Sequence, residues 1–277
     1  MERKLRLDKF LIERGFFTTR SKAQEAIKRG FVIVNGKKIN KSGFYVDKDS
    51  DIKILDNLPF VSRGGEKLKE IIDRFNIEIE NKICMDIGSG TGGFTEVLLR
   101  CGAKKVYAVD VGKGILDENL RRDKRVIVKE GLNARYIDEN DIPETVDLIV
   151  QDTSFISSKL IISNVKKFLK ENGDYILLVK PQFEVGKENL KYGVVKDFKI
   201  HKDILLSILN FIKIEGFHPI GLIPSPIKGK DGNIEYLIYM IKREILFDFS
   251  FEYIVEKVVK EAEEKFYEDR NFVQRNR

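Results

Sequence analysis

Short apolar runs separated by polar and glycine-rich segments recur through most of the chain. Their length and their β-branched residues are typical of strands that are buried on both faces of a parallel sheet. The intervening segments include helical patterns, such as the one over residues 94–100. The pattern therefore predicts an α/β domain, with strands at residues 83–87, 106–109, 125–129, 146–150 and 175–179.

The N-terminal part of the chain has a different pattern. Apolar residues over 5–11 have helical spacing, and a second helical segment ends at Gly30. The apolar residues 31–34 then run into Asn35 and Gly36, a dipeptide typical of a type I′ hairpin turn. This pattern predicts a small α+β module of two helices and a hairpin in front of the larger domain.

Basic residues are concentrated in that module. Residues 1–41 hold 12 Lys or Arg and 4 Asp or Glu, a net charge of +8, whereas the whole chain carries +6. The rest of the chain is therefore close to neutral. A compact basic segment joined to a nearly neutral body indicates a module that binds a polyanion, although a basic solvated surface is the simpler explanation in a lysine-rich chain.

The sequence lacks the patterns of membrane and secreted proteins. No apolar run reaches the roughly 18 residues of a membrane-spanning helix, and the first residues lack the apolar core of a signal peptide. The two cysteines are Cys84, in a predicted strand, and Cys101, near a helix end, so no disulfide framework is expected. These observations predict a cytoplasmic location.

Three segments of the N-terminal module, at residues 6–11, 19–23 and 27–36, resemble the S4 RNA-binding domain. Where that family usually has Ser-Arg before its second helix, this chain has Thr19 and Arg20, which keeps a helix-capping hydroxyl. The resemblance implies contacts with the phosphates of structured RNA, which supply affinity more than sequence choice. The candidate RNA-binding residues are Arg6, Arg20, Lys22, Lys28 and Arg29.

The expected domain limits follow from these patterns. The S4-like module covers residues 1–59, and residues 60–66 connect it to the next domain. The α/β domain covers residues 67–243. Residues 244–277 form a C-terminal helical extension, because apolar residues recur there at helical spacing between charges.

The first predicted strand of the α/β domain runs into a glycine-rich loop at residues 88–93 and then a helix, and the second strand ends in Asp110. This order is typical of the first unit of a nucleotide-binding fold. Glycines let the backbone approach the ligand, and a carboxylate 20 residues after Gly90 can hold ribose hydroxyls. The pattern predicts an adenosine-type cofactor.

Two cofactors share this pattern, a nicotinamide dinucleotide and S-adenosylmethionine. Asp86 suits the cationic amino-acid end of S-adenosylmethionine, and Asn133, after the third strand, can read adenine. An apolar hairpin over residues 219–223 and 234–240 predicts the reversed last strand of a Rossmann-like class I methyltransferase sheet. These features favour S-adenosylmethionine. The candidate cofactor-binding residues are Asp86, Gly88, Ser89, Gly90, Thr91, Gly92, Phe94, Asp110, Val111, Asn133 and Asp152.

Two charged residues end predicted strands of the sheet. Asp152 follows strand 146–150, and Lys180 follows strand 175–179 and precedes Pro181, which cannot extend the ladder. Because strand carboxyl ends share one edge in a doubly wound sheet, both side chains are expected to face the transferred group. Burial favours the neutral amine form of a lysine side chain. Lys180 is therefore the candidate to take the proton of an alcohol acceptor or to orient its oxygen. A surface salt bridge is the simpler explanation for either residue alone.

A second resemblance covers five segments, at residues 62–68, 86–95, 152–157, 178–184 and 225–236. They are similar to the TlyA family, also labelled haemolysin A, in which an S4 domain precedes an FtsJ-like methyltransferase domain. This resemblance implies 2′-O-methylation of cytidine in ribosomal RNA, in 16S RNA, 23S RNA or both. One departure is Gly90, where the family commonly has serine, and it is expected to loosen the loop. The implied catalytic set is Lys67, Asp152, Lys180 and Glu235.

Three other functions share parts of this pattern. A base-modifying methyltransferase would have the same fold and cofactor, but amino-group methylation usually places two prolines and an aromatic after the fourth strand, where this chain has Asp-Thr-Ser-Phe. A haemolysin-type membrane-active protein would need a membrane-crossing pattern that the sequence lacks. A noncatalytic RNA-binding protein is disfavoured because all four implied catalytic positions carry reactive side chains. His201 and His218 have no partners at metal-ligand spacing, so no metal is expected.

Overall fold

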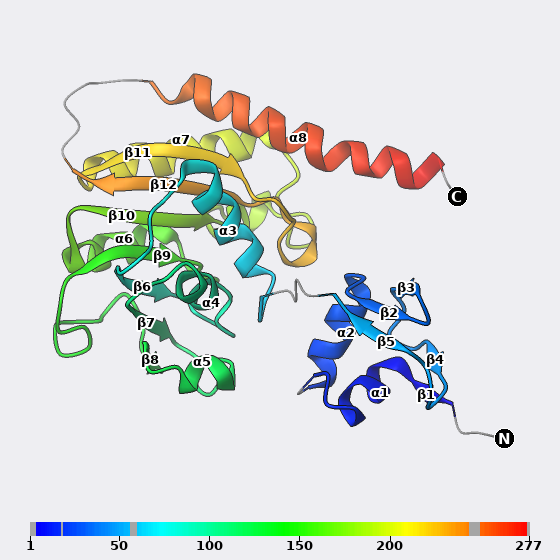
Figure 1. Cartoon of the computed structure of the whole chain (residues 1–277). Helices are drawn as coiled ribbons and strands as arrows, with labels where there is room; N and C mark the ends of the chain where they lie inside the picture. Colours follow the sequence, from blue (N-terminus) through cyan, green and yellow to red (C-terminus); the bar gives the residue numbers. More distant parts are fainter. Residues whose placement is uncertain (1–3, 18, 56–59, 244–249, 276–277) are drawn as a thin grey trace. The chain divides into compact units, whose positions relative to one another are not determined.

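A computed structural model describes residues 4–17, 19–55, 60–243 and 250–275 of the chain. It divides the chain into two compact units, Met1–Val61 and Ser62–Arg277, each described here by itself (Figure 1). Residues 56–59 and 244–249 hold the predicted end of the S4-like module and the predicted start of the C-terminal extension, and they lie outside the described residues. The predicted domain limits therefore stay predictions.

The first unit contains the two helices and the hairpin that its sequence pattern predicts. Thr19 caps the second helix, because its side chain accepts a hydrogen bond from the backbone N–H of Lys22. Asn35 and Gly36 have φ values of 48° and 75°, as a type I′ turn requires. The elements are β1 (Leu5–Arg6), α1 (Leu7–Glu13), α2 (Arg20–Lys28), β2 (Val32–Val34), β3 (Lys37–Ile39), β4 (Tyr45–Val46) and β5 (Ile52–Ile54).

One detail of this unit differs from the sequence pattern. Leu5 and Arg6 were expected in the first helix, but they form β1, which pairs antiparallel with β4. Local helical spacing cannot anticipate a partner strand that lies farther along the chain. The apolar faces of α1 and α2 pack on β2 around a core of Leu7, Phe10, Leu11, Ala23, Ala26, Ile27, Val32 and Val34.

The second unit is built on a seven-stranded sheet of order β11-β12-β10-β9-β6-β7-β8. The five strands from β10 to β8 run parallel, whereas β12 is antiparallel to both of its neighbours. This topology confirms the predicted Rossmann-like methyltransferase sheet with a reversed last strand. The strands are β6 (Ile83–Ile87), β7 (Lys105–Asp110), β8 (Val126–Glu130), β9 (Val146–Gln151), β10 (Leu169–Val179), β11 (Phe217–Pro224) and β12 (Tyr236–Lys242).

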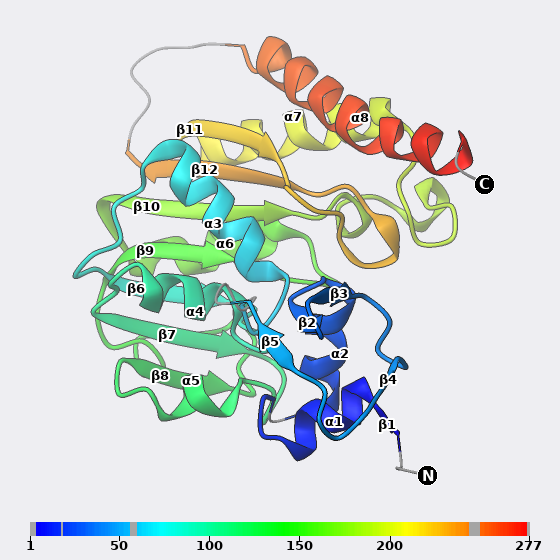
Figure 2. The same ribbon diagram turned by 45° about the vertical axis from the view of Figure 1, so that its right-hand side comes forward.

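Helices cover both faces of this sheet. Helices α3 and α4 lie on one face, and α6 and α7 lie on the other (Figures 1 and 2). A single apolar cluster joins α6, α7 and the C-terminal helix α8 to one face of the strands. The helices are α3 (Gly64–Phe75), α4 (Gly93–Arg100), α5 (Glu118–Arg122), α6 (Ser158–Val165), α7 (Phe198–Ile214) and α8 (Glu252–Arg275), and short 3₁₀ turns span Lys166–Phe168, Pro181–Phe183, Lys187–Asn189 and Lys230–Gly232.

The C-terminal helix α8 packs against α7 and β11. Its apolar residues recur every three or four positions, so Val255, Val258 and Val259 are buried on the same side as Phe251, which precedes the helix. Ile254, at the margin of this stripe, stays 43% exposed. The helical pattern noted in the sequence is thus the stripe by which α8 joins the core.

Two strand limits differ from the sequence pattern. Strand β10 begins at Leu169, well before the apolar run at residue 175, because Leu169 already pairs with Val146 of β9; a register shift follows, and the regular ladder resumes at Asp174. Glu235 was expected inside the last strand, but β12 begins one residue later, at Tyr236. Strand ends are set by pairing with neighbours, which composition alone does not encode.

At Gly88, two strand ends approach each other closely at the centre of the sheet. Its φ is +81°, and an added Cβ would lie 2.4 Å from the carbonyl oxygen of Asp152. We expect Gly88→Ala to lower the unfolding free energy by about 3 kcal/mol, measured by denaturant titration, because strain and a backbone clash add. Gly90→Ala is the control: its φ is +53°, the nearest atom lies 3.9 Å away, and only about 1 kcal/mol should be lost. Equal losses would contradict this explanation.

Candidate active site

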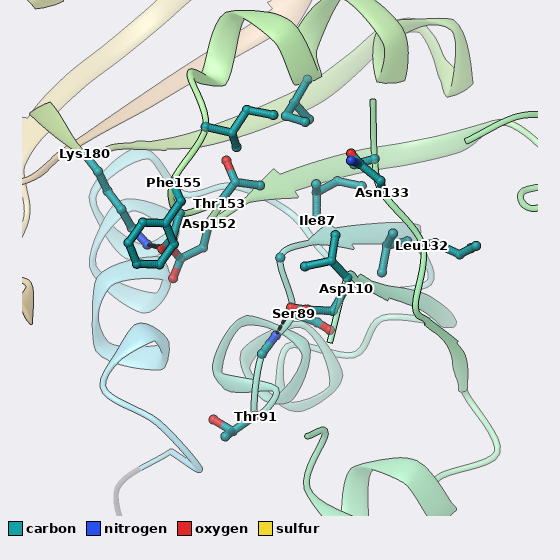
Figure 3. A pocket seen from close by; sticks show the side chains of 18 of the residues that line it. Ile87, Ser89, Thr91, Asp110, Leu132, Asn133, Asp152, Thr153, Phe155 and Lys180 are labelled. Carbon is teal, nitrogen blue, oxygen red and sulfur yellow. Dashed lines mark hydrogen bonds and ion pairs between the residues drawn. The ribbon is translucent and has the colours of Figure 1, made fainter. Parts of the chain in front are cut away.

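A cavity of about 570 Å³ lies at the carboxyl edge of the parallel strands. This volume is within the range of small-molecule sites. Figure 3 shows Lys180, Asp152 and Phe155 gathered on one side of it, while Leu132 and Asn133 lie across from them. The predicted residues that line the cavity are Gly88, Ser89, Gly90, Thr91, Asp110, Val111, Asn133, Asp152 and Lys180.

Asp110 holds the glycine loop in place. One oxygen of its carboxylate accepts a hydrogen bond from the backbone N–H of Gly90 at 2.8 Å, and the other accepts from that of Gly112 at 2.7 Å. The backbone N–H groups of Gly88 and Ser89 donate to the carbonyl of Val109. The end of β7 therefore fixes the loop that follows β6, so the loop is preformed next to the cavity.

Asp86 lies behind this loop and does not line the cavity. It is fully buried; Thr95 Oγ1 donates to its Oδ2 at 2.6 Å, while its Oδ1 has no hydrogen-bond partner. Burial raises the pKa of Asp86 to about 7, and the negative charges of Asp152 and Asp110 add to the rise that the Thr95 hydrogen bond opposes. Asp86 is thus a buried acid with one oxygen that is still able to accept a hydrogen bond.

Two other predicted cofactor-binding residues also lie outside the cavity lining. Gly92 precedes α4 with a φ of +99°, and an added Cβ there would meet Leu120 and Leu116. Phe94 is buried in α4 with 2% of its surface exposed. Both residues shape the loop and the start of its helix rather than the wall of the cavity.

Lys180 and Asp152 form an ion pair at the wall of the cavity. The Lys180 Nζ lies 2.5 Å from Asp152 Oδ1 and donates a hydrogen bond to Ser154 Oγ at 2.9 Å. The two side chains are 12% and 21% exposed. Two oxygen atoms from the segment that follows β9 therefore hold the Lys180 ammonium, and Lys180 still lines the cavity.

Lys67 and Glu235 form a second ion pair, which is more deeply buried. The Lys67 Nζ lies 2.5 Å from Glu235 Oε2, and the side chains are 9% and 3% exposed. Lys67 lies in the first turn of α3, whereas Glu235 immediately precedes β12. This pair joins parts of the second unit that are 168 residues apart.

Sheet register brings the two ion pairs to one edge. Val179 pairs with Tyr236 in the antiparallel ladder of β10 and β12, so Lys180 and Glu235 are the next residues beyond that pairing. In the parallel ladder Leu177 pairs with Gln151, which brings the segment after β9 alongside Lys180. All four implied catalytic residues therefore come from segments that meet at this edge.

Ser154 and Phe155 are two of the lining residues that the predicted site does not include. Ser154 accepts the hydrogen bond of Lys180, and Phe155 is 87% exposed with a φ of +63°. The Phe155 ring centroid lies 4.8 Å from that of Phe183. A phenylalanine with a left-handed backbone conformation is strained, and strained residues cluster at functional sites. Their place after a strand end and within the family-like segment 152–157 were the available signals, because a backbone angle leaves no mark in the sequence.

The predicted RNA-binding residues fall into two groups within the first unit. Arg6 and Arg20 are brought together, because both guanidinium groups contact Asp8. Lys28 and Arg29 lie at the other end of α2, roughly 12 Å along the helix from Arg20. The Arg29 guanidinium lies 5.2 Å from the Phe31 ring centroid. Lys22 is half-buried in the first turn of α2.

Two family models match this chain. The model of the FtsJ-like methyltransferases matches residues 60–242, and that of the S4 domain matches residues 5–52. A TlyA protein of Mycobacterium tuberculosis, named as a 16S/23S rRNA (cytidine-2′-O)-methyltransferase, is 37% identical over 87% of this chain and 91% of its own length. The chain belongs to the TlyA family of FtsJ-like methyltransferases.

Other members of the TlyA family carry a different name. Hemolysin A of Brachyspira hyodysenteriae is 41% identical over 86% of this chain and 100% of its own. A solved structure of a Streptococcus thermophilus protein with a hemolysin name is 37% identical, with a TM-score of 0.76 over 98% of this chain and 100% of that one. Within the described residues, no helix is long and apolar enough to cross a membrane.

The buried acid Asp86 gives a first test of the site. Because its folded-state pKa of about 7 lies above the ordinary 3.8, its ionisation destabilises the fold increasingly as pH rises from about 4 to 7. We expect Asp86→Asn to match the wild-type unfolding free energy near pH 4 and to exceed it by about 4 kcal/mol at pH 8, measured by denaturant titration.

Glu130 provides a control of opposite sign. Burial alone would raise its pKa, but hydrogen bonds from Gly114, Arg121 and Leu116 lower it to about 2. The stability that these bonds supply is present at neutral pH and is lost as pH falls through the folded-state value. Glu130→Gln should therefore lose stability at pH 8, where Asp86→Asn gains it. A pH-independent difference for Asp86→Asn would contradict the assigned cause.

The buried ion pair gives a second test. Glu235→Gln leaves the Lys67 ammonium buried without its countercharge, so we expect the unfolding free energy to fall by about 3 kcal/mol. The double variant Lys67→Met/Glu235→Leu should recover most of that loss of unfolding free energy. It should still lack methyltransferase activity. Glu256→Gln, in an exposed pair with Lys202 whose side chains are 38% (Lys202) and 70% (Glu256) exposed, should change stability by less than about 0.5 kcal/mol. A double variant as unstable as Glu235→Gln would contradict this account.

Proposed function

We propose that this protein is an S-adenosylmethionine-dependent methyltransferase that modifies the 2′-hydroxyl of cytidine in ribosomal RNA. The observation that carries the proposal is the Lys180–Asp152 ion pair at the wall of a cavity that the glycine loop also lines. The names of the Mycobacterium tuberculosis and Campylobacter jejuni relatives, both rRNA (cytidine-2′-O)-methyltransferases, support the same substrate.

The residues of the cavity fit S-adenosylmethionine. Gly88 lets the glycine loop lie against the backbone of Asp152 at the cavity wall, and Asp110 and Asn133 offer polar groups for the ribose and the adenine. Asp86, by contrast, is fully buried behind the loop and does not line the cavity, so its predicted contact with the cofactor stays a prediction. When bound, this cofactor supplies an electrophilic methyl group on a sulfonium centre.

Lys180 is the residue we assign to the acceptor hydroxyl. A ribose hydroxyl is too weak an acid to ionise near neutral pH, so its proton must leave as the new O–C bond forms and the S–C bond breaks. As the ammonium of its ion pair, Lys180 orients the acceptor oxygen, and it accepts the hydroxyl proton only after it has passed its own proton to Asp152. Asp152 and Ser154 fix the Lys180 Nζ from one side, which leaves it directed at the cavity. Positioning of this kind lowers the barrier by removing orientational freedom.

Lys67 and Glu235 adjust the field around Lys180. The edge holds two cationic and two anionic side chains, so their summed charge is zero and the buried groups compensate one another. Negative charge that develops on the acceptor oxygen is then stabilised by ammonium groups already in place.

The exposed ring of Phe155 supports a nucleotide acceptor. A base can stack on an aromatic face whatever its sequence context, and Phe155 presents its face beside Lys180 (Figure 3). A hydroxyl acceptor is favoured over a base nitrogen because the groups next to this ring are an ammonium and a carboxylate. A ribosomal RNA substrate also agrees with the predicted cytoplasmic location.

Methyl transfer to purified 30S and 50S ribosomal subunits tests this function. We expect wild-type protein to transfer radiolabel from S-adenosylmethionine, and nuclease digestion to release it as 2′-O-methylcytidine. Lys180→Ala should lower the rate by at least about 100-fold because the hydroxyl loses its positioned partner. Label on base atoms, or an unchanged rate in the variant, would overturn the proposal.

A matched lysine controls for nonspecific effects of the substitution. Lys170, near the start of β10, pairs with Asp147 of β9 at 2.6 Å, at the opposite end of the same two strands. Lys170→Ala therefore removes a Lys–Asp pair of similar length, more exposed than the Lys180–Asp152 pair, at a place that does not line the cavity. It should retain wild-type activity, and a similar loss in both variants would show that the Lys180 effect is not local.

A further inference from the structure

Asp8 is a fully buried carboxylate at the start of α1. Arg6 contacts it twice, through Nε and Nη2, both at 3.1 Å. Arg20 Nε donates at 2.9 Å and Gln24 Nε2 at 2.7 Å, both from α2. Burial alone would raise the pKa of Asp8, but the hydrogen bonds from Arg6, Gln24 and Arg20 outweigh it and hold the pKa well below its ordinary value.

The two arginines are fixed by this carboxylate while remaining open to solvent. Their side chains are 38% (Arg6) and 51% (Arg20) exposed. Within the part of the chain that the structure describes, the contacts of both guanidinium groups leave Arg6 Nη1 and both Nη atoms of Arg20 without a protein acceptor. A guanidinium has five N–H donors in a rigid fork, so these groups can bind a second anion in a set geometry.

The geometry points to a preformed phosphate site: we propose that Asp8 is a positioning residue that holds Arg6 and Arg20 for one phosphate group of structured RNA. The inference rests on the proposed function, because it takes the substrate to be RNA. The net charge of +8 over residues 1–41 supports a polyanion at this module. Two guanidinium groups on one carboxylate form a unit of net charge +1, which suits a single phosphate.

The positioning role and a purely electrostatic role of Asp8 predict opposite changes in RNA affinity when Asp8 is replaced. If the module bound RNA only through its summed charge, replacing Asp8 by asparagine would remove a negative charge and strengthen binding. If Asp8 positions the arginines, the same substitution frees both side chains and weakens binding despite the gain in positive charge. The sign of the change in affinity therefore separates the two explanations.

The experiment compares full-length variants in filter binding to purified 16S and 23S ribosomal RNA between 50 and 300 mM KCl. We expect Asp8→Asn to bind about tenfold more weakly than wild type, with a shallower dependence of affinity on salt because one phosphate contact is lost. Asp47→Asn is the matched control: it removes the same charge from the same module, but Asp47 is 51% exposed and lies 3.7 Å from Lys4. It should bind RNA as tightly as wild type or slightly more tightly.

Two further readouts separate positioning from loss of structure. Arg6→Lys and Arg20→Lys keep the charge and the fold but lose the forked geometry, so each should also bind RNA about tenfold more weakly. Thermal unfolding and S-adenosylhomocysteine affinity should stay at wild-type values in both lysine variants. If Asp8→Asn unfolds the module, these lysine variants decide the question.

The outcomes also distinguish this inference from the proposed function. Equal or tighter RNA binding by Asp8→Asn, or wild-type binding by both lysine variants, would overturn the inference and leave methyl transfer by the wild-type protein intact. Absence of any methyl transfer by wild type would instead defeat the proposed function. Weaker binding in Asp8→Asn with unchanged binding in Asp47→Asn is the result that supports the site.

Discussion

The residue after β10 and the residue before β12 are neighbours because these strands run in opposite directions, with Val179 opposite Tyr236. The candidate site depends on this register. A slip by one residue would turn the alternating side chains of β12 to the other face and move Glu235 away from the start of α3. The register is enforced by burial: Tyr236, Leu237, Ile238 and Met240 are fully buried, so no shifted pairing keeps the same core.

The charged groups at this edge are tolerated for different reasons. Lys67 with Glu235 and Lys180 with Asp152 are neutral as pairs, so each charge has an opposite charge close to it. Asp86 has no cationic partner, so its burial makes the carboxylate unfavourable near neutral pH. A fold that keeps an unpaired buried acid beside a preformed loop gives up stability, as sites that bind a cationic ligand commonly do.

Much of the fold could be predicted because local pattern and tertiary structure agree. The strand, glycine loop, helix and Asp110 form one continuous segment whose roles depend on neighbours in sequence, and the structure bears that pattern out. What failed depends on distant partners. The start of β12 after Glu235 and the strand at Leu5 are set by pairing with strands that are distant in sequence. The link between Asp8 and α2 was likewise missed, because an aspartate in a first helical turn has an ordinary local explanation in the helix dipole.

The position of β12 in the sheet has a consequence for the order in which the site is assembled. This strand is inserted between β10 and β11, although both precede it in the chain. While the polypeptide is being synthesised, β10 therefore has an unpaired edge, and Lys67 has no countercharge until Glu235 has left the ribosome. Because distant contacts form late, the ion-pair edge is completed only when nearly the whole domain is present. A nascent chain that lacks its last strand can thus have a complete glycine loop and still lack the Lys67–Glu235 half of the candidate site.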